Sequence, residues 1–138
     1  MGLDNGFLVK SNIRKITRDM LPADINYPFE EDYNGEPEVI YWRKCWGLRN
    51  DIMETFRWTD NYFEPNDPYV INTPKQVAKL IEIIASWMNE SRWEEDGRSI
   101  WDYEEIHNTL ISNIMNLTSI YAFMSLNPDV YLEFYDSY

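Results

Sequence analysis

The fold is decided by the stretch Thr-Pro-Lys-Gln-Val-Ala-Lys-Leu-Ile-Glu-Ile-Ile-Ala-Ser-Trp-Met, residues 73–88. Thr73 supplies a capping hydroxyl, Pro74 stands at the first helical position, and Gln76 can reach back to the cap. Apolar residues then recur every three or four positions, at Val77, Leu80, Ile81, Ile84, Trp87 and Met88. The pattern predicts an amphipathic helix over about residues 73–90, with a charged loop at 94–97 behind it.

A second helix is predicted downstream, over residues 102–125. Asp102, Glu104 and Glu105 suit the positive end of a helix dipole, and Asn127 with Pro128 would end the helix. Between these ends the apolar positions recur at helical spacing, at Ile106, Leu110, Ile114, Leu117, Tyr121 and Met124.

A third helix is predicted upstream, over residues 38–57. Val39, Trp42, Trp46, Met53 and Phe56 are separated by three, four or seven positions, and Gly47 is the weak point of the helix. The intervening segment, residues 61–72, contains two prolines and closes with a possible short strand at 69–71.

Strands are predicted at the two ends of the chain. In the last segment, apolar residues alternate with more polar ones, at Val130, Leu132 and Phe134. A period of two residues is typical of a strand, and we expect this segment to pair with residues 7–9. Residues 21–37 are rich in Pro, Asn, Gly and Asp and are predicted to form an acidic surface loop outside the core.

We therefore expect an α+β fold dominated by about three packed amphipathic helices, with a small sheet made from the terminal strands. The chain has 138 residues, of which 44% are hydrophobic and 16% aromatic, enough for one core. A single domain over residues 1–138 is the simplest organisation.

The net charge of the chain limits the kinds of molecule that it can bind. There are 24 acidic and 12 basic side chains, for a net charge of −12. Residues 19–42 and 99–138 contain no lysine or arginine. Because nucleic acids and anionic membranes are bound through basic residues, we expect neither as a direct partner. One cysteine, no signal-peptide pattern and no long apolar run indicate a cytoplasmic protein that does not span a membrane.

Catalytic and metal-binding groups are scarce. His107 is the only histidine, so its Glu-x-x-His pairing with Glu104 is half of a di-iron motif without its second copy. Cys45 has basic neighbours that can activate a thiol, but it also lies among apolar residues, where a buried, inert thiol is expected. Asp60, Glu64 and Asp67 lack the pattern of a calcium loop, and no glycine-rich phosphate loop is present. We predict no catalytic residue, no metal and no cofactor, although an uncharacterised enzyme using Glu104, His107 or Cys45 stays open.

A possible ligand-binding face lies on the predicted helix at 38–57. Arg43, Asn50 and Arg57 are seven residues apart, with Trp46 beside them. Arginine forks and an indole ring can hold an anion or a base through bidentate hydrogen bonds and stacking. The alternative is a buried Trp46 whose neighbouring arginines pair with nearby carboxylates.

Two motifs suggest a resemblance. The start Met1-Gly2-Leu3-Asp4 and the run Glu38-Val39-Ile40-Tyr41-Trp42-Arg43-Lys44 resemble a family of small phage and prophage proteins of uncharacterised function. Family members continue with Asn and Ile-His where this chain has Cys45-Trp46-Gly47-Leu48-Arg49-Asn50. The resemblance implies a phage or mobile-element protein in a bacterial cytoplasm, and it implies no reaction.

The leading hypothesis is a non-catalytic binding protein that presents a negative surface to a basic, nucleic-acid-handling protein, as an inhibitor or polyanion mimic. Complementary charge speeds and orients such docking, and aromatic residues supply affinity. The candidate partner-binding residues are Glu30, Glu31, Asp32, Glu94, Glu95, Asp96, Tyr131 and Tyr135. The alternative is a binder of a nucleotide or another anion at Arg43, Trp46, Asn50 and Arg57.

Overall fold

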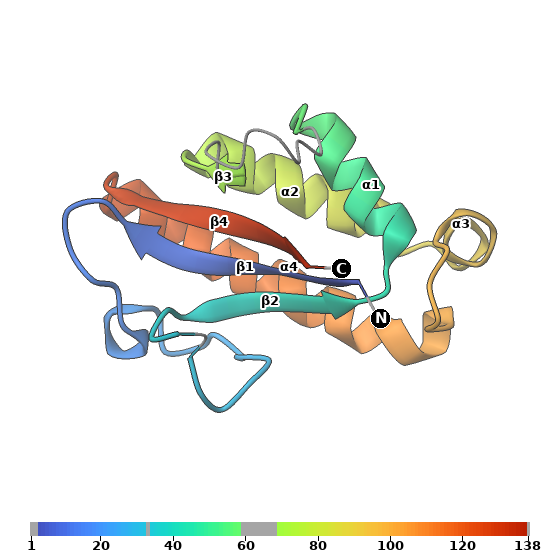
Figure 1. Ribbon diagram of the computed structural model, residues 1–138, viewed down its shortest axis with the longest axis horizontal. Coiled ribbons are helices and arrows are strands. Elements are labelled where there is room, and N and C mark those ends of the chain that lie inside the picture. The colour runs from blue at the N-terminus through green and yellow to red at the C-terminus, as the bar shows by residue number, and fades with distance from the viewer. Residues whose placement is uncertain (1–2, 33, 59–68, 138) are drawn as a thin grey trace.

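A computed structural model describes residues 3–32, 34–58 and 69–137 of the chain. These residues form an α+β fold in which helices pack against a four-stranded antiparallel sheet (Figure 1). In chain order the elements are β1 (Asp4–Ser11), a 3₁₀ turn (Arg18–Met20), β2 (Glu38–Arg43), α1 (Trp46–Thr55), β3 (Tyr69–Ile71), α2 (Pro74–Ser86), α3 (Glu90–Asp96), α4 (Tyr103–Leu126) and β4 (Val130–Ser137).

The two ends of the chain meet in the middle of the sheet. The strand order is β2-β1-β4-β3, so the first and last strands are the central pair. Phe7 lies opposite Phe134 and Val9 opposite Leu132, which confirms the predicted pairing of the terminal strands. The short strand at 69–71 is also confirmed, as β3 on the edge beside β4.

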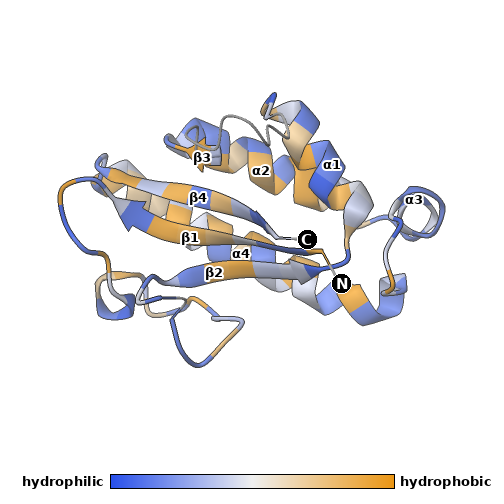
Figure 2. Cartoon of the chain, in the orientation of Figure 1, coloured by the Kyte–Doolittle hydropathy of each residue, from blue (hydrophilic) through white to orange (hydrophobic). Residues whose placement is uncertain are grey.

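The core lies between the inner face of the sheet and the helices. Alternate strand residues point inward, among them Phe7, Ile40, Trp42 and Phe134, with Phe7 edge-on to Trp42. In Figure 2 the apolar colour follows the strands and the helices that pack on them. Helix α4 packs against both α2 and β2, so it connects the helical layer to the sheet.

The helix predicted from residue 73 is confirmed, with its capping signal. The Thr73 hydroxyl accepts from the Gln76 N–H, and the Gln76 side chain accepts from the Thr73 N–H. The predicted loop at 94–97 is wrong in part, because Asn89 caps a further helix, α3, that includes residues 94–96. The helix predicted over 102–125 is confirmed as α4, with Asp102 and Glu105 forming its capping box.

The helix predicted over residues 38–57 is wrong in its first third. Residues 38–43 form β2, because β-branched and aromatic residues favour a strand. In this strand successive side chains point to opposite faces, so Ile40 and Trp42 point inward and Tyr41 points outward. Lys44 has a positive φ of 55°, which interrupts regular structure before α1 begins at Trp46. The helix-like spacing from Val39 to Trp46 therefore arises by chance, because these residues belong to two different elements, β2 and α1.

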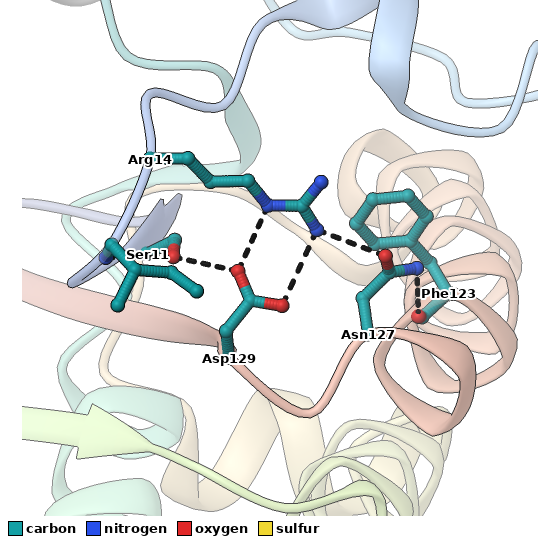
Figure 3. Close-up of polar contacts among 6 residues, drawn as sticks. Ser11, Arg14, Phe123, Asn127 and Asp129 are labelled. Atoms are coloured by element: carbon teal, nitrogen blue, oxygen red, sulfur yellow. Dashed lines mark hydrogen bonds and ion pairs between the residues drawn. The ribbon is translucent and has the colours of Figure 1, made fainter.

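The loop predicted at 21–37 is confirmed as a loop, but it is not outside the core. Leu21 and Ile25, with Ile16 before them, are buried in the main apolar cluster. Figure 3 shows how the preceding segment is also attached: Arg14 binds the carboxylate of Asp129 and the side chain of Asn127 at the turn between α4 and β4. Ser11 donates to the same Asp129 carboxylate at 2.7 Å.

Candidate functional site

The four residues predicted to bind a ligand do not share one helix face. Arg43 is exposed at the end of β2, and Trp46 is the first residue of α1. Asn50 lies in the middle of α1, whereas Arg57 follows the helix with a positive φ of 57°. Arg43, Asn50 and Arg57 would lie along one face only if residues 43–57 formed one continuous helix. Because residues 38–43 form a strand, the three side chains are not aligned in this way.

Asn50 does line a hollow, but with other partners than predicted. The hollow has a volume of about 460 Å³ and lies between α1, Trp87 at the end of α2, and α3. Its arginines are Arg49, Arg92 and Arg98, and its acids are Asp51, Glu54 and Asp96. The lining is therefore balanced in charge and offers no net attraction for an anion.

Two of these arginines are already engaged. Arg49 is buried and binds Asp136 of β4 at 2.5 Å, while its other nitrogen donates to Asn50 at 2.9 Å. Arg92 binds Asp51 at 3.1 Å and lies 3.9 Å above the Trp87 ring, whose indole N–H also donates to Asp51. Both guanidinium groups thus connect elements of the fold: Arg49 joins α1 to β4, and Arg92 joins α3 to α1.

We call residues 90–105, which run from α3 into the start of α4, the acidic corner; Figure 1 shows where α3 lies. Residues 90–105 contain seven acids and two bases. The two bases, Arg92 and Arg98, line the hollow beside α1 together with Asp96, and Arg98 is also exposed. The exposed residues of the corner include Glu94, Glu95, Ile100, Trp101, Asp102, Glu104 and Glu105.

Several contacts hold the acidic corner in place. The Trp93 indole donates to the carbonyl of Trp101 at 2.7 Å, and the Trp101 indole donates to the carbonyl of Arg43 at 2.9 Å. Glu94 accepts from the N–H of Tyr103, so the end of α3 is tied to the start of α4. Ile100 and Trp101 nevertheless stay 59% and 37% exposed, so this acidic segment also presents apolar side chains.

The predicted acidic residues of the 21–37 loop lie at a different end of the molecule from α3 (Figure 1). Glu30 and Glu31 are exposed, whereas Asp32 forms an ion pair with Arg18. Nearby bases are engaged too: Lys10 binds Glu36 at 3.3 Å and Glu133 at 2.6 Å. The loop is therefore a weaker negative surface than its composition indicates.

Tyr131 and Tyr135 are less accessible than predicted, because both are only partly exposed. Tyr135 lies over Gly6, where any side chain on residue 6 would collide with its ring, and its hydroxyl hydrogen-bonds the Glu38 carboxylate. Tyr138 falls outside the described residues. Tyr135 thus belongs to the packing of the outer sheet face.

This outer face holds an unusual group of titratable side chains. Glu38 is only 2% exposed, and burial together with nearby Asp4 raises its pKa, against the hydrogen bond from Tyr135. Tyr41 donates to Asp4 at 2.6 Å, and burial with this hydrogen bond raises the pKa of Tyr41 to about 12. Burial and the Glu38 carboxylate also raise the pKa of Tyr135.

The candidate nucleophile and metal ligands do not converge. Cys45 is a buried free thiol, and burial raises its pKa to about 11, which fits the inert alternative. His107 stacks edge-on against Tyr103, one turn earlier in α4. Among the described residues, no three His, Cys, Asp or Glu side chains are grouped so that they could hold a metal. Asp60, Glu64 and Asp67 lie outside those residues.

Sequence reasoning did not single out Asn113 and Asn116, which are buried in α4. Asn116 accepts from the N–H of Asn26 and donates to the carbonyls of Asn26 and Val39. Asn113 accepts from the Trp42 indole at 2.6 Å and donates to the Thr109 carbonyl. A signal was available, because both amides interrupt the apolar stripe of α4 at i and i+3.

In the described part of the chain, every helix is too short or too polar to cross a bilayer. No family model, curated protein or solved structure matches this chain.

Proposed function

We propose that this protein is a small, acidic, non-catalytic binding protein that docks through its acidic corner onto a basic, nucleic-acid-handling protein. The observation that carries the proposal is the concentration of exposed carboxylates in residues 90–105. Exposed acids within six positions of the exposed Ile100 include Glu94, Glu95, Asp102, Glu104 and Glu105. Of the two bases in the segment, Arg92 is already paired with Asp51. Charge complementarity would steer a basic partner, and the apolar side chains would supply contact energy.

The expected partner is a nucleic-acid-binding protein, because an array of carboxylates resembles a row of phosphates in charge. A surface of closely spaced negative groups on a rigid scaffold offers a cationic groove the same attraction as a phosphate backbone. The protein would then act by competing for a polyanion site. The resemblance of the first residues and the Tyr41-Trp42-Arg43-Lys44 run to small phage proteins supports placing this partner in a bacterial cytoplasm.

The balanced charge of the hollow at Arg49 and Asn50 does not favour the anion-binding alternative, since Arg49 and Arg92 already bind carboxylates. An enzyme is favoured still less, because Cys45 is buried and His107 faces a tyrosine ring.

The test compares two variants that remove the same number of charges. One carries Glu94→Gln, Glu95→Gln and Glu104→Gln in the acidic corner. The control carries Asp19→Asn in the 3₁₀ turn and Glu30→Gln and Glu31→Gln in the loop. Each is used as bait in a nuclease-treated bacterial lysate at low salt. We expect the wild type and the control to retain a basic protein that high salt or added duplex DNA releases, and the corner variant to lose it.

A Trp101→Ala variant should weaken the same capture at least tenfold with the charge unchanged. Equal capture by the corner variant and the control, or capture that neither salt nor duplex DNA releases, would contradict the proposal.

A further inference from the structure

A groove runs along the free edge of β2, on the side of the sheet away from β1. It is lined by residues 26–28 of the loop, by Val39 and Tyr41 of β2, and by the 108–116 face of α4, and its volume is about 390 Å³. Although the protein carries a net charge of −12, this lining contains no charged side chain. Carboxamides, hydroxyls and two tyrosines provide its polar groups.

The backbone of Tyr41 faces this groove. In an antiparallel strand, successive residues direct both backbone groups alternately to one neighbour and then to the other. The Lys44 N–H donates to the carbonyl of Leu3, just before β1, so Ile40 and Trp42 also face β1. Tyr41, like Val39 and Arg43, must therefore face the open edge.

The contacts of the neighbouring residues agree with this assignment. The carbonyl of Val39 accepts from Asn116 of α4, and the carbonyl of Arg43 accepts from the Trp101 indole. At both flanking positions of the edge the carbonyl is thus occupied by a side chain of the same molecule. Between them, Tyr41 presents one N–H and one C=O side by side, and no described side chain binds either group.

The uncharged lining and the single free backbone pair of Tyr41 limit the kind of ligand that the groove can bind. An added peptide strand would need the backbone of alternate edge residues, and Val39 and Arg43 are blocked. An anion would meet no cation among the lining residues, because Arg18, which lies over the Tyr27 ring, is paired with Asp32. It would also meet the negative field of the whole molecule. A small uncharged molecule with a donor beside an acceptor fits the single backbone pair.

We propose that the β2-edge groove binds an uncharged nucleobase or nucleoside, whose donor and acceptor pair with the backbone of Tyr41. The amide of Asn108 is exposed at the rim and available to a ligand, whereas Asn113 and Asn116 hold the groove in shape. This site is independent of the acidic corner and of the function proposed for it.

The test is titration calorimetry of the full chain with adenosine, guanosine, cytidine and uridine, each compared with its 5′-monophosphate and with glucose. We expect at least one nucleoside to bind with a Kd below 1 mM, and its monophosphate to bind at least tenfold more weakly because of the negative field. No binding of any nucleoside, tighter binding of the monophosphate, or equal binding of glucose would overturn the proposal.

Two pairs of variants locate the site. Asn108→Phe should block the rim and weaken nucleoside binding at least tenfold, whereas Thr118→Phe, exposed on the same helix outside the groove, should not. Tyr41→Pro removes the backbone donor at a strand edge, where proline is tolerated, and Tyr41→Val keeps it. Weaker binding by the proline variant than by the valine variant is expected, and equal binding by the two would refute the role of the backbone.

Discussion

At the residue scale, Glu38 is a carboxylate whose burial is unfavourable for its charged form. It is 2% exposed on the outer face of the sheet, one of its carboxylate oxygens has no hydrogen-bond partner among the described residues, and Asp4 is nearby. A buried carboxylate without full hydrogen bonding favours its protonated form. Cys45 responds to burial in the same direction, since its pKa is also raised.

The raised pKa of Glu38 predicts a pH dependence of stability. Because the folded state binds this proton more tightly than the unfolded state does, stability falls as the pH rises through the folded pKa. Glu38→Gln removes the titration and keeps an oxygen that can accept from Tyr135. We expect the free energy of unfolding of the variant, relative to wild type, to increase between pH 4 and pH 8 in urea titrations. A difference that does not change with pH would contradict this assignment.

Gly47 illustrates a second residue-scale constraint, which the sequence shows only as a weak point in a helix. A Cβ at this position would lie 2.4 Å from the carbonyl of Asp96 and 2.8 Å from that of Gly97. The N–H of Gly47 donates to the same Gly97 carbonyl at 2.7 Å. Glycine therefore allows the start of α1 to touch the end of α3.

At the element scale, Asn116 attaches the acidic loop to α4. Its amide satisfies both backbone groups of Asn26 and the carbonyl of Val39. Ile25, next to Asn26, enters the core at this point. The loop and the edge of β2 thus share one anchor on the helix.

Asn116→Ala should destabilise the protein by about 1–3 kcal/mol, because it leaves the buried Val39 carbonyl without its partner and removes both bonds to Asn26. Asn108→Ala, on the exposed side of the same helix, should change stability by less than about 0.5 kcal/mol. Urea unfolding measures both, and hydrogen exchange should show that the Asn26 amide loses protection only in the first variant. Equal stability of the two variants would show that the loop does not depend on this amide.

At the scale of the whole molecule, β4 is the strand that completes the sheet. It lies between β1 and β3, and its inward residues Val130, Leu132 and Phe134 are buried. The central pair therefore joins residues more than a hundred positions apart, such as Phe7 and Phe134. Such non-local pairing cannot form before nearly the entire chain is present.

A fragment of residues 1–127 should consequently show no cooperative unfolding by circular dichroism. Adding a synthetic peptide of residues 128–138 should restore native-like structure, because the missing strand can pair with β1 from a separate chain. Cooperative unfolding of the fragment alone would show that the helices and remaining strands form a sufficient core.

Several elements could be predicted from local sequence because local physics sets them. The capping box at Thr73 and Gln76, the acidic start of α4 and the alternation in β4 each act within a few residues. The same reasoning failed at residues 38–43, where three- and four-residue spacing imitated a helix and only pairing with β1 made the segment a strand.

The sequence by itself determined the α+β class, the alternation that makes β4 a strand and the excess of negative charge, since these depend on short-range pattern and composition. Only the tertiary structure decided how that charge is used. Folding turned Arg92 toward Asp51, neutralised part of the loop through Arg18 and Lys10, and left the acidic corner exposed around Ile100 and Trp101. Contacts between residues distant in the chain select each ion pair, and no local pattern encodes them.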